Sequence, residues 1–495
     1  MILDVIYNNV VNSQLVISYI NDKGGVDLKH YTVSDQPNQF TKWVYSHNPA
    51  EVMQGVISFD GKPVKLDFAS RYNRFDFMQF VNGLPEAERE MLLGFKPISW
   101  YFFDIETEIE DEFPDAENAK TPIVSICVTA MDSKLTSIVL TTDPLHKETA
   151  EEATKITVDY IQTNYDKNQE VDVRFVYCAS EYELIKIFLQ IYKKIPALSG
   201  WNIGPGERAY DWPYILNRMK KLGLSMTEAS IDGTLDRHGL PNHKLNVDYM
   251  ELFKKYDFSL KPYESYRLDW VAGKSLKLPK LPYDGTLKQL RENDLARFLA
   301  YNAIDTIILA LLHKKHNLVS VLNGLSLVTS LPMRDCMGPV NQSEAVLFKY
   351  YFKQKGPNGE IVVCPQRENR PTKYKYDGGY VKDPARQIAK YVICLDFSSL
   401  YPSLYRTMNQ GPTNILFDGR TLTPSEIAQY SSNPNYIISA QGRLYDNRKP
   451  SAYKEVQSEL YVKRKEYQGD QFFYLNQIHF PVQQEEKRRG LVDSI

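Results

Sequence analysis

The sequence has few cysteines and no long uninterrupted apolar run. Its 495 residues include five cysteines, which are scattered and form no CxxC pair, so the pattern argues against a zinc site and a disulfide scaffold. No apolar stretch approaches the ~18 residues of a membrane span, and no basic segment followed by an apolar run opens the chain. We therefore expect a cytoplasmic protein that contacts no membrane.

The charge is almost balanced, which excludes a globally basic nucleic-acid-binding protein. Lys+Arg 59 against Asp+Glu 61 give a net charge of -2. Any nucleic-acid surface must therefore be a local groove, offset by acids elsewhere, as a metal-binding carboxylate site requires. Aromatic residues are abundant, with 34 tyrosines and 22 phenylalanines, which suit core packing and also base stacking. The length predicts roughly three or four domains.

The segment Tyr101–Thr107 predicts a buried strand that carries two acids. Strand alternation places Asp104 and Glu106 on one face and Phe103 and Ile105 on the other. Adjacent carboxylates repel each other and are costly to desolvate, and a divalent cation such as Mg²⁺ or Mn²⁺ removes that cost. An edge strand with one solvated polar face explains the local pattern equally well.

Two later segments add further acids and a tyrosine. Asp211 lies where a helix N-cap belongs, with a proline in the first turn and Gly223 at the end, so capping explains this acid about as often as a metal does. Tyr301 and Asp305 are four residues apart in an expected helix over residues 291–313 and share one face. A lone carboxylate among apolar residues needs a partner, although a partly exposed helix face is the alternative for this pair.

The order of the expected strands and helices separates two kinds of domain. Residues 1–97 read as short alternating strands with a hairpin at Asp60-Gly61 and a closing helix around Gly83–Leu93. From there on, strands alternate with helices over residues 148–160 and Glu181–Lys194, which favours an α/β domain with a central mixed sheet.

Taken together, the acidic motifs resemble the three exonuclease motifs of family B DNA polymerases. Asp-Ile-Glu on a strand, Asp211 after the Asn202 turn, and Tyr301-x-x-x-Asp305 on a late helix occur in the family's order. The segments 248–256 and 280–285 look like those of replicative polymerases of large tailed phages. The resemblance implies a ribonuclease-H-like 3′–5′ exonuclease domain that uses two Mg²⁺ or Mn²⁺ ions.

The resemblance also implies a role for each of these residues. Asp104 would bridge both ions, with Glu106 and Asp305 as further ligands. Asp211 would act through coordinated waters, and Tyr301 would position the attacking water. One departure is that the stretch before Asp211 is longer here than is usual in the family.

A second set of motifs resembles the polymerase module of the same family. Tyr376-x-Gly378-Gly379 resembles the family's Tyr-x-Gly-Gly element between the two modules, which implies contact with DNA. The segment YVICLDFSSLYPSL, residues 391–404, predicts a buried strand ending in an acid and a turn. It closely resembles polymerase motif A.

Motif A implies a nucleotide site built around Asp396. That acid would bind both catalytic metals, and backbone groups of Ser398, Ser399 and Leu400 would hold the nucleoside triphosphate. Tyr401 would stack under the sugar and exclude a 2′-hydroxyl. The alternative is an ordinary strand-to-helix turn capped by Asp396.

Residues 458–468 read as the first basic helix of a fingers domain. Two further family motifs, Lys-x-x-x-Asn-Ser-x-Tyr-Gly and Asp-Thr-Asp, do not follow Asp396 in the sequence. Because phosphoryl transfer needs a second palm carboxylate, nucleotide incorporation would need a second chain. We therefore expect the N-terminal part or subunit of a split replicative DNA polymerase. The alternatives are a truncated copy of a longer polymerase, a stand-alone 3′–5′ exonuclease and a non-catalytic nucleic-acid-binding remnant.

The expected fold is a multidomain α/β protein with five segments. These are a β-rich N-terminal domain over 1–97, an exonuclease domain over 98–325, a return to the N-terminal domain over 326–367, a partial palm over 368–454 and the start of the fingers over 455–495. The expected partners are primer–template DNA, a single-stranded DNA 3′ end, a deoxynucleoside triphosphate once the site is completed, a second polymerase chain and a sliding clamp. A phage-encoded chain would work in the host cytoplasm.

Overall fold

A computed structural model shows two compact units. One comprises residues 1–40 and 69–342, and the other comprises residues 41–68 and 343–495. The five segment boundaries expected from the sequence stay predictions. The residues that the structure describes are 1–8, 14–32, 41–68, 74–96, 98–109, 114–131, 134–204, 209–257, 264–365, 382–383, 388, 390–397 and 399–467.

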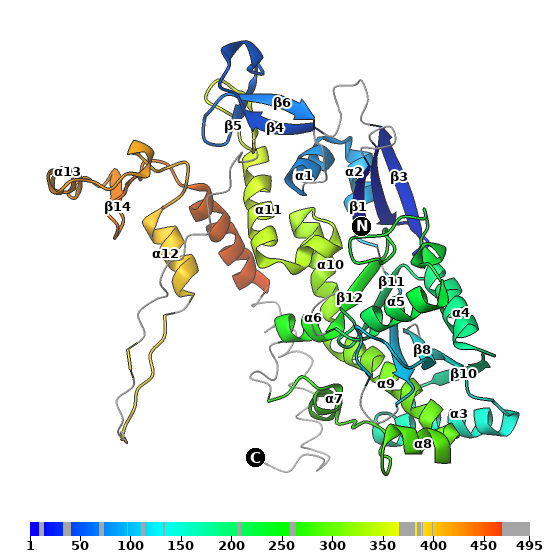
Figure 1. The fold of residues 1–495 in the computed structure, drawn as a ribbon. Helices are drawn as coiled ribbons and strands as arrows, with labels where there is room; N and C mark the ends of the chain where they lie inside the picture. The colour runs from blue at the N-terminus through cyan, green and yellow to red at the C-terminus, as the bar shows by residue number, and fades with distance from the viewer. Residues whose placement is uncertain are drawn as a thin grey trace. The chain divides into compact units, whose positions relative to one another are not determined.

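The first unit begins with a three-stranded antiparallel sheet whose apolar face is covered by two helices (Figure 1). Alternating apolar residues of the strands pack on Phe77, Val81 and Leu92 of the helices. The closing helix expected around Gly83–Leu93 starts only after Pro85, and the helix before it was not predicted. The elements are β1 (Ile2–Asn8), β2 (Gln14–Ile20), β3 (Val26–Thr32), α1 (Arg74–Gly83) and α2 (Glu86–Leu93).

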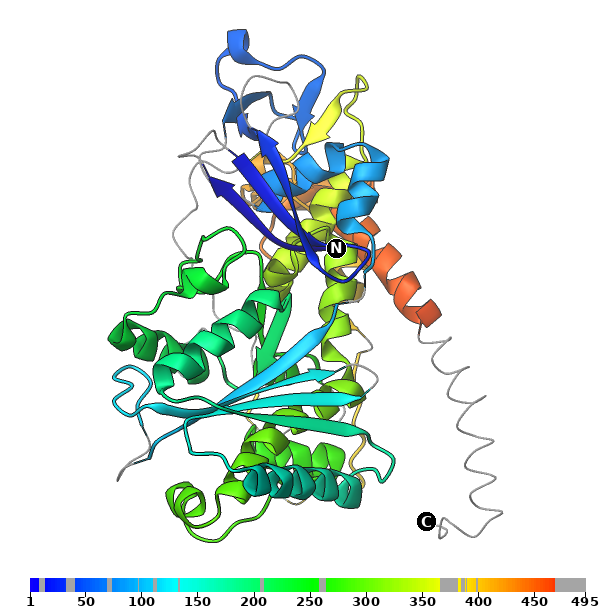
Figure 2. The ribbon, with the colours of Figure 1, turned by 90° about the vertical axis from the view of Figure 1, so that its right-hand side faces the viewer.

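The rest of this unit is built on a six-stranded sheet in the order β10-β9-β8-β7-β11-β12. Strand β7 is antiparallel to β8 but parallel to β11, which confirms the expected mixed sheet. This layer is seen beneath the N-terminal sheet in Figure 2. The strands are β7 (Trp100–Thr107), β8 (Ile123–Met131), β9 (Leu135–Thr141), β10 (Val171–Tyr177), β11 (Ala197–Gly200) and β12 (Leu245–Asp248).

Helices cover both faces of the mixed sheet. Apolar residues of α4 and α5 form one core with Phe103 and Ile105 of β7, while α9 packs against β7, β8 and β9. The helices of this part are α3 (Lys147–Asn164), α4 (Glu181–Lys194), α5 (Asp211–Leu222), α6 (Tyr249–Tyr256), α7 (Leu268–Leu276), α8 (Leu287–Asn293), α9 (Leu295–His316) and α10 (Leu318–Thr329), with short 3₁₀ turns η2 (Met226–Ala229) and η3 (Met333–Met337).

Helix α9 is the central helix of this unit. The single helix expected over residues 291–313 is wrong at its start, because α8 ends at Asn293 and a separate helix, α9, begins after Asp294. The Asp294 carboxylate accepts a hydrogen bond from the backbone N–H of Arg297 at 3.0 Å, which caps the second helix. Its length and apolar composition would suffice to cross a membrane, but 89% of its apolar window is buried inside the fold.

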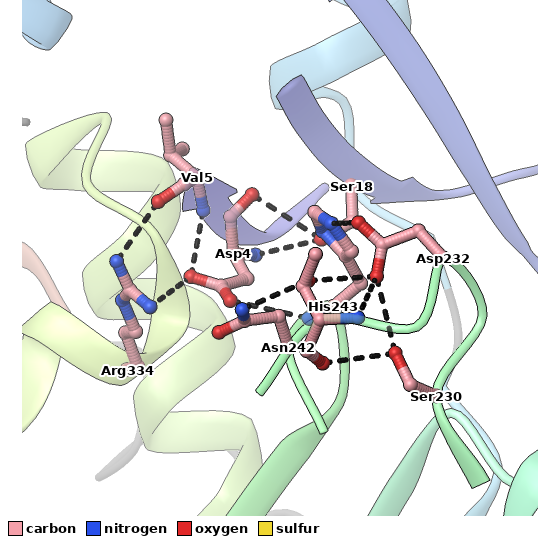
Figure 3. Close-up of polar contacts among 9 residues, drawn as sticks. Asp4, Val5, Ser18, Ser230, Asp232, Asn242, His243 and Arg334 are labelled. Atoms are coloured by element: carbon pink, nitrogen blue, oxygen red, sulfur yellow. Dashed lines mark hydrogen bonds and ion pairs between the residues drawn. The ribbon is translucent and has the colours of Figure 1, made fainter. Parts of the chain in front are cut away.

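A buried polar network joins strand β1 to distant parts of the same unit (Figure 3). The Asp4 carboxylate pairs with Arg334 and accepts a hydrogen bond from the backbone N–H of His243 at 3.2 Å. His243 is fully buried, and its Nε2 atom lies 3.0 Å from the Asp232 carboxylate. Burial raises the pKa of Asp4, while Arg334 acts against that rise. Asp4 therefore holds three segments together through one carboxylate.

This network predicts a clear loss of stability in Asp4→Ala. The substitution removes the carboxylate that pairs with the Arg334 guanidinium and accepts from the His243 N–H, and hydrogen bonds to a charged group contribute about 1.5–3 kcal/mol each to stability. We expect the free energy of unfolding to fall by roughly 2–3 kcal/mol, measured by denaturant titration. Asp22→Ala is the matched control, since Asp22 pairs with Lys96 at the surface with its side chain 85% exposed. Equal losses in the two variants would contradict this role for Asp4.

The described residues of the second unit form three two-stranded sheets, one of which pairs β14 with β15, and several short helices. The hairpin predicted at Asp60-Gly61 is wrong, because its two strands pair with different partners. Gly61 forms the expected turn, its N–H donating to Ser58 O at 2.9 Å. Strand β5 (Val56–Ser58) pairs with β13 (Ile361–Val363), and β6 (Val64–Phe68) pairs with β4 (Thr41–Tyr45). The other elements are η1 (Pro49–Glu51), α11 (Pro339–Phe352), α12 (Leu400–Met408), η4 (Phe417–Gly419), α13 (Pro424–Tyr430), β14 (Tyr436–Ile438) and β15 (Leu444–Asp446), and residues 452–467 are helical.

The buried strand predicted just before Asp396 is also wrong. Residues 392–397 are irregular and exposed, with Ile393 83% and Leu395 89% accessible. A strand needs neighbours to satisfy its backbone and cover its side chains. No strand among the described residues pairs with this segment, so its apolar side chains are left uncovered.

Candidate metal centre

Three carboxylates from two elements meet beside the mixed sheet. Ligand oxygens of Asp104, Glu106 and Asp305 all lie within 4.8 Å of one another. The first two project from β7 and are half-buried, and Asp305 on α9 is only 3% exposed. Three mutually repelling acids in a partly buried site favour a bound cation.

Strand alternation directs the two β7 acids toward α9. The alternate residues Phe103 and Ile105 lie in the core on the other face, where the Phe103 ring is 4.9 Å from that of Trp212. Since adjacent side chains of a strand point to opposite faces, Asp104 and Glu106 must face the helix that carries Asp305. The predicted placement of these acids on one face is confirmed.

Asp211 lies near this cluster but outside its three closest acids. It is the first residue of α5 and is 4% exposed, while Tyr210 is the N-cap, so the N-cap prediction is off by one residue. Gly223 ends the helix with φ 68, as expected. Burial raises the pKa of Asp211, and the charge of Asp104 raises it further. The negative charge of Asp104 therefore disfavours the ionised form of Asp211.

Burial and mutual repulsion make the cluster hard to ionise without a cation. Burial raises the pKa of Asp104 to about 7, and the charge of Asp305 adds to the rise. Burial also raises the pKa of Glu106, with further contributions from Asp104 and Asp305. Because the pKa of Asp104 is higher in the folded chain than in the unfolded chain, its protonated form stabilises the fold at low pH. This contribution to the free energy of unfolding is lost as the pH rises from about 4 through 7.

Lys280 is a member of the site that the sequence did not single out. Its ammonium group pairs with Asp305 and donates to the Tyr301 hydroxyl at 3.0 Å. Burial lowers the pKa of Lys280, but Asp305 and Tyr301 more than offset it, so that the pKa lies well above the usual lysine value. The ring of Tyr283 meets Tyr301 edge-on at 5.4 Å. The one sequence signal was the resemblance of segment 280–285 to phage polymerases, which named no role.

The donor set fits a hard divalent cation. Oδ2 of Asp305 accepts from Lys280, whereas Oδ1 is buried and accepts no hydrogen bond from the described residues. A buried acceptor without a partner costs about 1–3 kcal/mol, which a cation would offset. Carboxylate oxygens are the ligands that Mg²⁺ and Mn²⁺ prefer.

The geometry agrees with comparisons of the sequence with known families. Residues 81–270 match DNA polymerase family B, exonuclease domain, and residues 346–470 match DNA polymerase family B. The chain belongs to DNA polymerase family B. Its acid cluster draws on strand β7 inside the first matched region, as the resemblance implied.

Phage and archaeal polymerases are among the relatives of this family B chain. It is 26% identical over 400 residues to the DNA-directed DNA polymerase of Escherichia phage RB69, covering 74% of this chain and 42% of the relative. The polymerase of Enterobacteria phage T4 is 28% identical over 324 residues, covering 61% and 35%. DNA polymerase 1 of Saccharolobus solfataricus is 28% identical over 347 residues, covering 66% and 36%. The chain thus spans well under half the length of these relatives.

The residues predicted to form motif A of this family B chain lie in the second unit. Asp396 is on the exposed irregular segment, and Leu400 and Tyr401 begin α12. Ser399 is the N-cap of that helix with φ 54, and its hydroxyl accepts a 3.4 Å hydrogen bond from Arg464. Asp396 is not in the acid cluster found among the described residues. Ser398 and the predicted DNA-contacting residues Tyr376, Gly378 and Gly379 lie outside the described residues.

Proposed function

We propose that the chain removes nucleotides from the 3′ end of single-stranded DNA, as the proofreading exonuclease of a replicative polymerase. The observation that supports this most strongly is the group of three carboxylates within 4.8 Å, one with a buried unpaired oxygen. The test is incubation of a 5′-labelled single strand with the chain and Mg²⁺. Stepwise shortening from the 3′ end is expected, and an intact strand would contradict the proposal.

The site residues take the roles that the family resemblance implied. Asp104, Glu106 and Asp305 would hold two Mg²⁺ or Mn²⁺ ions, and Asp211 would contribute through water. Bound there, the ions would supply an activated water and neutralise charge on the scissile phosphate. Tyr301 and Lys280 would orient the attacking water and the scissile phosphate.

Tyr301 and Lys280 are placed to act on the water and the charge beside the acids. The Tyr301 hydroxyl accepts from Lys280, so its own proton can be donated to an acceptor. Asp305 beside it is one such acceptor, and the oxygen of an attacking water would be another. The Lys280 ammonium carries positive charge at the cluster and would favour the negative charge that develops on the phosphate. Both groups are held in place by α9 and the segment that contains Lys280.

We also propose that the second unit supplies one part of a nucleotide-incorporation site. Asp396 would bind both catalytic metals, while Ser398, Ser399 and Leu400 would hold the triphosphate and Tyr401 would exclude a 2′-hydroxyl. The uncovered apolar segment before Asp396 supports the idea that a further part of the polymerase packs there, which in a split polymerase is a second polypeptide. That polypeptide would bring the missing palm and fingers motifs, as in a split polymerase.

The partners follow from these two proposed activities. They are primer–template DNA, the single-stranded 3′ end, a deoxynucleoside triphosphate, the completing chain and a sliding clamp, all in the cytoplasm of the host cell if the chain is phage-encoded. With a net charge of -2, DNA affinity would come from a local basic groove, and such binding weakens with added salt.

A further inference from the structure

A buried amide lies directly behind the acid cluster. Asn302 is on α9, between Tyr301 and Asp305 in sequence, and is fully buried. Its Nδ2 atom donates to Asp104 Oδ2 at 3.2 Å, and its Oδ1 atom accepts from the Ser125 hydroxyl at 2.9 Å. One side chain therefore connects α9 with both β7 and β8.

The chemistry of the three groups sets the orientation of this amide. An ionised carboxylate only accepts hydrogen bonds, so the amide nitrogen must face Asp104. The Ser125 hydroxyl then holds the amide oxygen. Ser125 on β8 lies opposite Glu106 of β7. The hydrogen bond from Ser125 therefore holds the Asn302 amide beside the two strand positions that carry Asp104 and Glu106.

We propose that Asn302 is a positioning residue, which holds the Asp104 carboxylate in the orientation that binds a divalent cation. The inference rests on the proposed exonuclease site. The amide N–H donates a hydrogen bond to Oδ2 of Asp104. This bond keeps the carboxylate from rotating away from the negative charge of Asp305, which repels it. Groups that orient metal ligands in this way typically change metal affinity by about 10–100-fold when they are removed.

A second polar contact on the same helix supplies a matched control. Thr306 lies one turn from Asn302 and its hydroxyl is 2.9 Å from Cys127 Sγ and 2.7 Å from Thr129 Oγ1. It is also fully buried and also connects α9 to β8, but its hydrogen bonds to described residues go to Cys127, Thr129 and the Ala303 carbonyl and not to an acid of the cluster. Thr306→Val therefore disturbs the same packing interface and leaves the hydrogen bond between Asn302 and Asp104 in place.

The test is Mn²⁺ affinity of the full chain without DNA, measured by calorimetry for Asn302→Leu, Thr306→Val and the parent. Asn302→Leu keeps a similar volume and removes both hydrogen bonds, so its Mn²⁺ affinity should fall by about 10–100-fold. Thr306→Val should lower the melting temperature to a comparable extent and leave Mn²⁺ affinity unchanged. Equal weakening in both variants, or unchanged affinity in Asn302→Leu, would overturn the proposal.

An activity measurement separates this inference from the proposed function. At saturating Mn²⁺ the Asn302→Leu variant should regain most of the parental digestion rate, because the defect is in metal binding. No recovery at high Mn²⁺ would count against a positioning role. If the parent binds Mn²⁺ but digests no DNA, the proposed function fails while the affinity comparison still decides the role of Asn302.

Discussion

The double variant Asp104→Ala/Glu106→Ala should lose nearly all digestion of single-stranded DNA. It removes two of the three carboxylates that lie within 4.8 Å of one another. Metal ions stabilise the transition state of phosphate hydrolysis by several kcal/mol, so we expect a fall of about three orders of magnitude or more in rate. The measurement is the rate of shortening of a 5′-labelled strand in Mg²⁺.

Two controls show whether a loss of activity comes from misfolding or from the change in net charge. They are the melting temperature of the double variant and a surface variant that removes the same charge. The acids have raised pKa values in the folded chain, so their ionised forms destabilise it at pH 8, and their removal should raise the metal-free melting temperature. Glu148→Ala/Glu152→Ala removes the same charge from the exposed side of α3 and should digest at the parental rate. Parental activity in the double variant of the cluster would show that the site is elsewhere.

The second large expected effect is that the chain alone incorporates no nucleotides. Asp396 offers one palm carboxylate, and two-metal phosphoryl transfer needs a second shared anchor to align the primer 3′ oxygen with the α-phosphate. The segment before Asp396 exposes Ile393 and Leu395, which normal packing in a palm sheet would cover. Primer extension by the purified chain should therefore be undetectable.

Extension should appear when a polypeptide with the missing fingers and palm motifs is added. Asp396→Asn in this chain should abolish the restored extension and leave digestion of a single strand intact, since the exonuclease acids are unchanged. Extension by the chain alone would contradict the split arrangement, because the second metal anchor would then lie within these residues.

Local patterns predicted the parts of the site that depend on backbone geometry. Alternation along β7 placed Asp104 and Glu106 on one face, and the four-residue spacing placed Tyr301 and Asp305 on one side of α9. These follow from fixed strand and helix periods. The helix Glu181–Lys194 has the bounds that its apolar spacing predicted, and the structure shows that the Ser180 side chain caps its start.

The groups that tertiary packing brings to the site could not be predicted from local patterns. Lys280 lies outside the helices and strands, 25 residues before Asp305, and no periodicity marks it. Asn302 is polar in a helix whose neighbours are apolar, which signals a partner but not its identity. Both were found only when the packing of α9 on the sheet was known.

Strand partners were likewise outside the reach of local patterns. The turn at Asp60-Gly61 forms, but pairing is decided by distant segments, and β5 joins β13 from more than 300 residues later. The segment before Asp396 has the composition of a buried strand, yet a strand forms only where neighbours are present to pair with it. Composition therefore predicted that this segment favours a strand, but it could not predict that the segment is irregular in this structure.

The most direct test of the central claim is the number of Mn²⁺ ions that the chain binds at the acid cluster. The account predicts two ions per chain by electron paramagnetic resonance titration with a bound single strand that resists hydrolysis. It also predicts that Asp104→Ala/Glu106→Ala loses both ions, whereas Glu148→Ala/Glu152→Ala keeps them. Two ions that persist in the Asp104→Ala/Glu106→Ala variant would contradict the account, because the carboxylates of β7 would then not be the metal ligands.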